Sequence, residues 1–400
     1  MAAAPEFTET ITKAGLTAVP VGPDEALEER IRRLRGNEGP ADPIVPNFPT
    51  DPLYDLRDDE REPFPWEKIS WLYDSLVVPV AWILNDDMIE DLVTFCRAWQ
   101  PDLVLCDAMT HAGAIAADAV GAAHARLLYW HDLNIRMRRD FLRAVKDQPP
   151  GRRTDMLHDW YEEWAGKFGR PFSEELVVGH FAVNVLPERT RLDPHEQTLS
   201  LRYVPYNGHS VVPPWLYEKP RVPRVLMTFG ILALSWVEER RMTVEQLQDT
   251  LDSLADLDIE LVITLAEEVR EQLTAPANCR MVGFVPLDVI LPTCSIVIHH
   301  GGAGSFNGPL VHGLPQLILE YSIDAPAKQQ IMAETKAGLS IPRDEVTGPR
   351  IRQDLLRLMN DETFREGAAQ LQREALAQPT PNALVPELEQ MTAQFRSRRA

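Results

Sequence analysis

The stretch HHGGAGSFNG, residues 299–308, combines two adjacent histidines with four glycines and a serine. It follows SIVI, a short apolar run that is typical of a buried strand. It precedes a segment that ends at Gly313 and has the pattern of a helix. The glycines therefore occupy a strand-to-helix turn, where free backbone N–H groups and the helix dipole can bind phosphate oxygens.

We expect the N–H groups of Gly304, Ser305 and Phe306 to point outward from the first turn of this helix. Glycine allows a ligand to approach the backbone closely and tolerates positive φ angles. A histidine beside a bound phosphate can donate a charge-assisted hydrogen bond of about 1.5–3 kcal/mol. We predict that His300 faces the turn and binds the ligand, whereas His299 packs at the strand end as a structural residue.

The spacing does not fit two familiar phosphate-binding motifs. No acidic residue follows at the place that the dinucleotide fingerprint GxGxxG requires, and no Gly-Lys-Ser/Thr follows as in a P-loop. A metal site on the adjacent histidines is disfavoured, because neighbours at a strand end point to opposite sides and no third ligand is evident. We therefore expect no metal at this turn.

The composition indicates an acidic globular protein. A chain of 400 residues is about right for two domains. The net charge of −20 argues against nucleic-acid or membrane-surface binding, because no basic face is evident. The four cysteines form no CxxC pair, which favours a reducing cytoplasm without disulfides or zinc. No stretch is long and apolar enough to span a bilayer, and no signal peptide is evident at the N-terminus.

Short apolar strands alternate with helices along much of the chain. In the second half, the predicted strands are VLMTF, DIELVITL, RMVGFV, SIVI, PQLILE and LSI. In the first half, they are PDLVLCD, HARLLYW, FAVNVL and LRYVPYNG. The helix before LSI is expected to end at Gly338. Continuous apolar strands between helices indicate an α/β fold whose parallel sheets are covered on both faces.

A proline-rich passage at residues 211–224 indicates a stiff linker between two domains. We therefore divide the chain into an N-terminal domain at 1–212, a linker at 213–223, a second domain at 224–380 and a C-terminal helix at 381–400. Ligands of doubly wound sheets bind outside the carboxyl ends of the strands. This rule places the HHGGAGS turn at the binding edge of the second domain.

The stretch GFVPLDVILPTCSIVIHHGGAGSFNGPLVHGLPQLILEYSIDAPAKQQ, residues 283–330, resembles the nucleotide-binding half of family 1 glycosyltransferases. The likeness is greatest to bacterial deoxysugar transferases that act on macrolide and anthracycline polyketides. The segments FTETITKAGLTAVPVG, RAWQPDLVLCD, AAHARLLYW and RYVPYNGHSVVPPWL extend it over nearly the whole chain. The resemblance implies the GT-B fold, in which two Rossmann-like domains, one for the acceptor and one for the nucleotide sugar, face a cleft.

The resemblance also implies a set of donor-binding residues. These are Gly230, Phe284, Val285, His300, Gly301, Gly302, Gly304, Ser305 and Asp324. Phe284 would lie against the nucleotide base, and the backbone of Val285 would pair with its edge. His300 and the glycine turn would contact the diphosphate, which Gly230 would allow to approach the first loop of the domain.

Asp324 corresponds to the acid that meets the donor sugar in the resembled group. Many members have a glutamine directly after it, whereas Ala325 follows here. A buried, unpaired amide costs about 1–3 kcal/mol, so its loss fits a donor that lacks the matching hydroxyls. An N-cap role for Asp324 ahead of APAKQQ is an alternative that can coexist with sugar binding.

The general base of the resembled group, commonly a histidine, lies just after a first strand that precedes the region matching FTETITKAGL. Because MAAAPEFTE looks like the end of the second strand, we expect the usual base to lie upstream of Met1. The first strand, the first helix and most of the second strand would then be absent from the sequence. As the explanation for this absence, we favour a misassigned start or a fragment over a degenerate relative.

Four residues within the chain are weak candidates for the base. They are Asp107, His111, His131 and Asp132, each with a cap or loop hydrogen bond as its alternative role. All four follow predicted strands of the first half, at strand ends that face the cleft between the domains. Asp132 matches an acid in the resembled group, whereas His131 does not.

The expected reaction is inverting transfer of a deoxysugar from a TDP-sugar to a hydroxyl of a macrolide-like polyketide, without metal or cofactor. A hydrophobic acceptor, an auxiliary activator protein and a homodimer are the expected partners. The main alternative is a non-catalytic nucleotide-sugar-binding or scaffold relative, and a GT-B epimerase or phosphorylase is a weaker one. The aromatic residues of WYEEWAGKFGRPF have helical spacing, which favours core packing over lining of an acceptor pocket.

Overall fold

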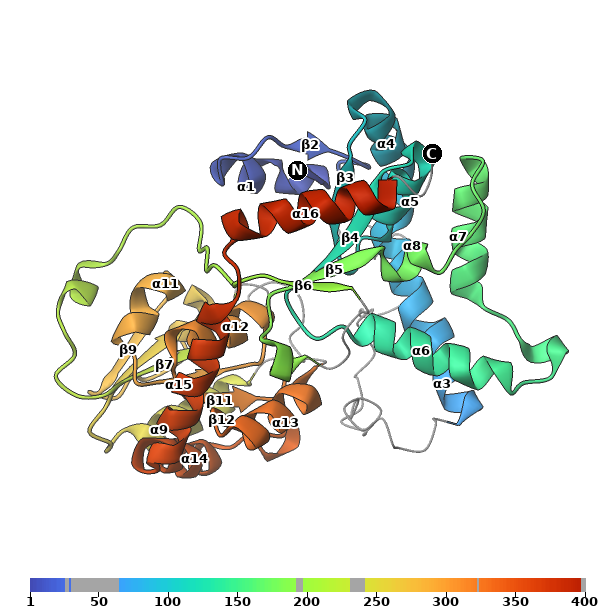
Figure 1. Ribbon diagram of the computed structural model, residues 1–400. Helices are drawn as coiled ribbons and strands as arrows, with labels where there is room; N and C mark the ends of the chain where they lie inside the picture. The colour runs from blue at the N-terminus through green and yellow to red at the C-terminus, as the bar shows by residue number, and fades with distance from the viewer. Residues whose placement is uncertain (26–28, 30–64, 192–196, 231–241, 322–323, 397–400) are drawn as a thin grey trace.

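The computed structural model describes residues 1–25, 29, 65–191, 197–230, 242–321 and 324–396. These residues form two α/β domains, each built on a parallel sheet (Figure 1). A third, two-stranded parallel sheet joins β1 (Ala2–Ala3) to β2 (Val19–Pro20), with α1 (Thr8–Lys13) between them in sequence. The predicted α/β class with two sheet-based domains is therefore confirmed.

Met1 lies beside the small sheet at the beginning of the chain. Its amino group donates to the carbonyl of Thr17 at 2.6 Å, and its carbonyl accepts from the N–H of Val19 at 2.9 Å. The Met1 side chain is 67% exposed. A strand, β1, directly follows Met1, as the likeness of MAAAPEFTE to a strand end predicts. Met1 contacts Thr17 and Val19, neither of which belongs to the HHGGAGS turn, so Met1 itself is not a site residue. A base upstream of Met1 stays a prediction.

The N-terminal domain has a four-stranded parallel sheet in the order β3-β4-β5-β6. Its strands are β3 (Leu103–Asp107), β4 (Ala123–Leu128), β5 (Phe181–Asn184) and β6 (Thr198–Ser200). The helices are α3 (Trp66–Leu72), α4 (Val78–Trp99), α5 (His111–Val120), α6 (Leu133–Lys146), α7 (Met156–Lys167) and α8 (Glu175–Val178). A π-helical turn at Tyr73–Val77 joins α3 to α4.

The predicted strand at LRYVPYNG is wrong. The last strand of this sheet is β6, just before that segment, and residues 201–208 have no regular structure. The backbone N–H of Leu201 still donates to the carbonyl of Asn184. Beyond it, Pro205 has no N–H to donate to a ladder, so the chain leaves the sheet instead of extending it.

The predicted aromatic core of the N-terminal domain is confirmed. Trp160, Tyr161 and Trp164 are buried in its main hydrophobic cluster, and Phe168 and Phe172 pack against that cluster. The indole N–H groups of both tryptophans donate to one oxygen of Asp86, at 2.7 and 3.0 Å. The helical spacing of these rings therefore serves packing between α7 and its neighbours.

The second domain has a six-stranded parallel sheet in the order β12-β11-β10-β7-β8-β9. Its strands are β7 (Arg224–Thr228), β8 (Glu260–Thr264), β9 (Cys279–Val282), β10 (Ile296–His299), β11 (Gln316–Leu319) and β12 (Gly338–Ile341). The main helices are α9 (Val244–Leu254), α12 (Ala303–His312), α13 (Ala325–Thr335), α14 (Gly348–Asn360) and α15 (Glu362–Ala377). Short helices α10 (Glu267–Arg270) and α11 (Leu287–Ile290) complete the described part.

The strand order of this sheet reverses between β7 and β10. From β7 the chain proceeds to β8 and β9 on one side, and from β10 to β11 and β12 on the other. The last residue of β10, His299, lies opposite Thr228 at the end of β7. The loops that follow these two strands therefore meet at a topological switch point, which is where open α/β sheets bind ligands.

The predicted end of α13 at Gly338 is wrong. The helix ends at Thr335, and its C-cap residue, Lys336, adopts the left-handed conformation with a φ of 55°. Gly338 instead opens β12, where a Cβ atom would lie 2.2 Å from the carbonyl oxygen of Gln316. Close packing of strand against strand, and not a helix terminus, requires glycine at this position.

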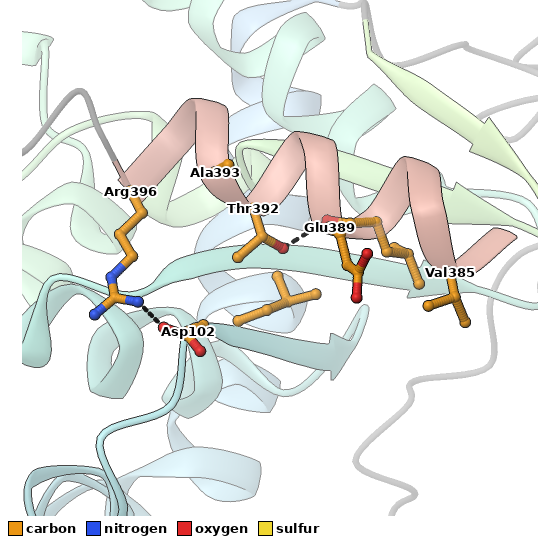
Figure 2. A pocket seen from close by; sticks show the side chains of 8 residues that line it. Asp102, Val385, Glu389, Thr392, Ala393 and Arg396 are labelled. Atoms are coloured by element: carbon orange, nitrogen blue, oxygen red, sulfur yellow. Dashed lines mark hydrogen bonds and ion pairs between the residues drawn. The ribbon is translucent and has the colours of Figure 1, made fainter.

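The C-terminal helix α16 (Pro381–Arg396) leaves the second domain and lies across the N-terminal sheet (Figure 1). The ring of Phe395 stacks on His180, with 4.6 Å between the ring centroids, and Arg396 pairs with Asp102 just before β3. A groove of about 670 Å³ lies between this helix and the start of β3. Figure 2 shows side chains that line it, among them Asp102 and Arg396. The helix thus ties the two domains together through contacts remote from the HHGGAGS turn.

Two expectations about the chain as a whole can be compared with the fold. Among the described residues, no helix has both the length and the apolarity needed to cross a membrane. All four cysteines are free, and Cys106 is buried against the carbonyl of Ala125. Burial raises the pKa of the Cys106 thiol to about 12, so this group is an inert part of the core.

Candidate nucleotide-sugar site

The HHGGAGS turn has the geometry of an anion-binding helix N-terminus. Gly301 has a φ of 91°, Gly302 is the N-cap residue, and α12 begins at Ala303. The first three N–H groups of this helix, on residues 303–305, have no earlier helical carbonyl to bond. The N–H of Phe306 donates to the carbonyl of Gly302 at 2.9 Å, so the prediction that it is free is wrong. The helix starts at Ala303, two residues before the segment SFNGPLVHG that was predicted to form it.

His299 has the structural role predicted for it. The side chain is fully buried, its Nε2 lies 2.7 Å from Oε1 of Gln316, and its Nδ1 accepts from the N–H of Gly301 at 3.1 Å. Burial lowers the pKa of His299 to about 3, so the ring is neutral at physiological pH. This histidine anchors the start of the turn to the neighbouring strand β11.

His300 is held between two glycines from the loops that meet at the switch point. A Cβ atom on Gly230 would lie 2.9 Å from Cε1 of the imidazole, and one on Gly302 would lie 2.4 Å from Nε2. Gly230 also has a φ of 71°, which disfavours any other residue. Burial, and secondly the charge of Lys328, lower the pKa of His300 to about 4. A neutral imidazole therefore lies directly at the turn.

The two residues expected at the nucleotide base differ in exposure. The Phe284 side chain is 52% exposed and follows β9, whereas Val285 is buried in the core beneath it. An aromatic ring open to solvent can stack on a planar base. Gly304 is also open, because the atom nearest to an added Cβ is the Tyr203 hydroxyl at 3.8 Å.

Asp324 lies in a buried ion-pair cluster at the start of α13. Its Oδ1 accepts from Nζ of Lys328 at 2.5 Å, and Nζ also donates to the carbonyl of Gly301 at 2.5 Å. Lys328 thereby connects the acid to the HHGGAGS turn. Asp324 occupies the N-cap position of α13, as the alternative interpretation predicts, but its side chain makes no capping hydrogen bond. The positive charge of Lys328 holds the pKa of Asp324 well below its usual range, against the effect of burial.

His131 reaches this cluster from the N-terminal domain. It follows β4, and its Nδ1 lies 3.2 Å from Oδ2 of Asp324, while its Nε2 lies 3.0 Å from the carbonyl of Thr190. The sequence indicated His131 only as a weak base candidate. Its partner Asp324 is 193 residues away, so no local pattern indicates this contact between the two domains.

The other base candidates lie at the carboxyl ends of β3 and β4 and have structural partners. Asp132 forms a double contact with Arg126, at 2.5 and 2.9 Å, and caps α6. Asp107 accepts from the N–H of Met109 at 2.8 Å. His111 lies 2.6 Å from the hydroxyl of Tyr161, and burial lowers its pKa to about 3. The structure thus gives Asp132 a cap contact and Asp107 a loop contact, whereas His111 contacts a side chain of α7.

A possible metal-ligand group occurs elsewhere in the fold. His158, Asp159 and Glu162 on α7 hold ligand atoms within 4.8 Å of one another. Both carboxyl groups are exposed, as acidic surface groups often are without a metal. These three residues belong to the N-terminal domain and not to the turn, so they place no metal beside His300.

One protein family matches almost the whole chain. The N-terminal domain of the family called erythromycin biosynthesis protein CIII-like matches residues 1–230, and its C-terminal domain matches residues 248–391. The chain belongs to this family. The predicted resemblance to family 1 deoxysugar transferases is thereby confirmed.

Relatives of this erythromycin CIII-like protein are transferases by name. The chain is 40% identical over 400 residues to the 10-deoxymethynolide desosaminyltransferase of Streptomyces venezuelae. This match covers 99% of the chain and 91% of the relative. The chain is 38% identical over 400 residues to the aclacinomycin-T 2-deoxy-L-fucose transferase of Streptomyces galilaeus, covering 99% and 90% of the two chains.

The fold of this erythromycin CIII-like protein matches that of a solved glycosyltransferase. The crystal structure of glycosyltransferase VinC in complex with dTDP superimposes with a TM-score of 0.81 and 34% identity, covering 98% of this chain and 92% of VinC. The predicted GT-B fold and the predicted class of enzyme are thus confirmed: the protein is a glycosyltransferase. The transferase names of its relatives do not favour the non-catalytic scaffold alternative.

Acid is expected to destabilise this erythromycin CIII-like protein through its buried neutral histidines. Burial lowers the pKa of His299 to about 3 from an ordinary value of 6.5. Below pH 6.5 the unfolded chain therefore takes up a proton that the folded protein does not bind. The stabilisation by neutral His299 is full above pH 6.5 and is lost as the pH falls toward the folded pKa, by about 1.4 kcal/mol per pH unit.

Urea unfolding at pH 7 and pH 5.5 would measure this loss. We expect the His299→Gln variant, whose side chain does not titrate in this range, to lose less stability between the two pH values than the unaltered protein. The matched control His209→Gln replaces an exposed histidine and should leave the difference unchanged. Equal losses for His299→Gln and the unaltered protein would contradict the assignment of His299 as a buried neutral group.

Proposed function

We propose that this glycosyltransferase moves a deoxysugar from a TDP-sugar to a hydroxyl group of a polyketide aglycone, with inversion at the anomeric carbon. The names of the two relatives, a desosaminyltransferase and a 2-deoxy-L-fucose transferase, support a deoxysugar donor. The complex of VinC with dTDP supports a thymidine diphosphate leaving group. In this proposal the N-terminal domain binds a hydrophobic acceptor and the second domain binds the donor.

The observation that carries the proposal is the position of His300 at the switch point. The imidazole lies between Gly230 and Gly302, directly before the free N–H groups at the start of α12. These donors converge where two loops meet, as a diphosphate with several acceptor oxygens requires. The open Phe284 ring supplies a surface on which the base can stack.

The proposed reaction is an in-line displacement. The acceptor oxygen forms a bond to the anomeric carbon as the bond from that carbon to the diphosphate oxygen breaks, and the acceptor proton passes to a base. Negative charge then accumulates on the departing TDP. The N-terminus of α12 and an N–H of His300 stabilise this charge, because both are already oriented toward it. In this proposal the turn takes the place of a metal ion.

The residue that removes the acceptor proton is not assigned. Asp132 is paired with Arg126, and the pKa of His111, about 3, is far from the range that suits a general base. Asp107, His111 and Asp132 stay predictions in this role, and so does a base upstream of Met1. The auxiliary protein, the homodimer and the cytoplasmic location also stay predictions, since each rests on the resemblance or on composition alone.

Calorimetric titration of the chain with TDP and with UDP tests the donor site. We expect TDP to bind and UDP to bind more weakly. A turnover assay with a TDP-deoxysugar and a polyketide aglycone then tests the transfer itself. Failure of both nucleotides to bind the folded protein would overturn the proposed function, because the HHGGAGS turn would then hold no nucleotide.

A further inference from the structure

The segment at residues 202–207, which follows β6, is fixed to the second domain at both of its ends. At one end, the backbone N–H of Arg202 donates to the carbonyl of Pro379 at 2.8 Å, and its guanidinium donates to two carbonyls at the end of α15. At the other end, Oδ1 of Asn207 accepts from the N–H of Asp288, in the first turn of α11, at 2.9 Å. These contacts hold the segment in place although it has no regular structure.

The Tyr203 side chain extends from this segment to the start of α12. Tyr203 is partly buried and packs against the hydrophobic cluster that contains Phe306 and Leu310 of that helix. Its hydroxyl is the atom nearest to a Cβ added at Gly304, at a distance of 3.8 Å. Gly304 is the second residue of α12, so its N–H is one of the three that have no earlier helical carbonyl to bond. The phenol oxygen therefore lies beside the free N–H groups of the HHGGAGS turn.

The hydroxyl of Tyr203 is available to a ligand at this turn. In the part of the chain that the structure describes, the Tyr203 side chain forms no hydrogen bond. Gly304 has no side chain that could cover the hydroxyl. Burial raises the pKa of Tyr203 above its ordinary range, so the phenol keeps its proton at neutral pH. A protonated phenol can donate to an anionic oxygen, which is also the group that a helix N-terminus binds.

We propose that Tyr203 donates a hydrogen bond to the diphosphate of the nucleotide sugar, so that the segment leaving the N-terminal domain forms one wall of the donor site. The inference rests on the proposed function, because it takes the HHGGAGS turn as the diphosphate site. A diphosphate that accepts from the free N–H groups of α12 has the Tyr203 hydroxyl beside it. Hydrogen bonds to a charged oxygen are shorter and stronger than neutral ones, so a single hydroxyl contributes measurably to binding.

Tyr203→Phe tests this contact, because phenylalanine keeps the aromatic ring and removes only the hydroxyl. Calorimetry at pH 7 would compare TDP with thymidine, which has no phosphate. We expect TDP to bind the variant about tenfold more weakly than the unaltered protein, whereas thymidine should bind both equally. The matched control Tyr206→Phe removes the hydroxyl of an exposed tyrosine in the same segment and should leave both affinities unchanged.

Two results would overturn the inference. If folded Tyr203→Phe binds TDP as tightly as Tyr206→Phe does, the hydroxyl does not meet the ligand. If TDP and thymidine lose affinity by the same factor, the hydroxyl contacts the nucleoside or supports the fold, and not the diphosphate. Urea unfolding of the variants would confirm that the proteins compared are folded.

Asn207→Ala tests whether the fixed segment positions Tyr203. The variant removes the acceptor for the N–H of Asp288, and we expect it to weaken TDP binding about threefold. In the Tyr203→Phe background the same change should have no further effect, because both changes then act on one contact. Additive losses would overturn the positioning role of Asn207.

The failure of this inference can be told apart from the failure of the proposed function. If TDP does not bind the unaltered protein, the proposed function fails and the inference falls with it. If TDP binds the unaltered protein and Tyr203→Phe equally well, the donor site is intact and only the role of Tyr203 is wrong.

Discussion

His300→Ala is expected to weaken TDP binding by about tenfold or more, which is the loss that removing one hydrogen bond to a charged group produces. The neutral imidazole lies between Gly230 and Gly302, where it can donate an N–H to a diphosphate oxygen. Alanine has no donor and leaves the space between the two glycines empty. Turnover should fall at least as far, because the same hydrogen bond stabilises the departing TDP.

Calorimetry with TDP and steady-state kinetics would measure both effects. The matched control is His312→Ala, which alters the last residue of the same helix, α12, at the end remote from the turn. His300→Gln retains an N–H donor on a shorter side chain and should recover part of the affinity. If folded His300→Ala binds TDP as tightly as the unaltered protein, His300 is not a diphosphate ligand and its role is confined to packing against the glycines.

Asp324→Asn is expected to lower the free energy of unfolding by about 3–5 kcal/mol, the usual cost of removing one partner from a buried ion pair. The variant leaves the Lys328 ammonium buried without its carboxylate partner. It should also reduce turnover of TDP-sugars more than binding of TDP, because the family resemblance places the donor sugar, and not the diphosphate, at this carboxylate.

Urea unfolding monitored by circular dichroism would measure the stability of Asp324→Asn. Asp344→Asn, a change of an exposed carboxyl, serves as the matched control and should shift stability by less than about 0.5 kcal/mol. Adding Lys328→Met to Asp324→Asn removes the stranded ammonium and should restore part of the loss. A stability for Asp324→Asn equal to that of the control would show that the buried cluster does not stabilise the fold.

The HHGGAGS turn could be placed from sequence because its determinants are local. The apolar residues 296–298 before it form β10 together with His299, and the glycine at 313 ends α12 as expected. The different roles of His299 and His300 also follow locally, since adjacent residues at a strand end face opposite sides. The resemblance added the GT-B fold, which local patterns alone do not specify, because they do not order the strands within a sheet.

Two errors in the prediction concern the backbone at glycines. The prediction placed the free N–H groups on residues 304–306, whereas they belong to residues 303–305, because Gly302 is the N-cap of α12. Gly338 was taken for a helix end, whereas its proximity to Gln316 across two strands is what requires glycine. At Gly338 the residue type was informative, but the reason for glycine lay in the neighbouring strand β11, a contact that the sequence does not reveal.

The amino-acid sequence by itself determined the alternation of strands and helices, the glycine turn and the histidines that flank it. These features depend on side-chain periodicity and backbone preferences over a few residues. Only the tertiary structure decided that His131 reaches Asp324 and that His300 lies against Gly230. Such contacts join residues from separate strands and domains, so their geometry depends on how the whole chain packs.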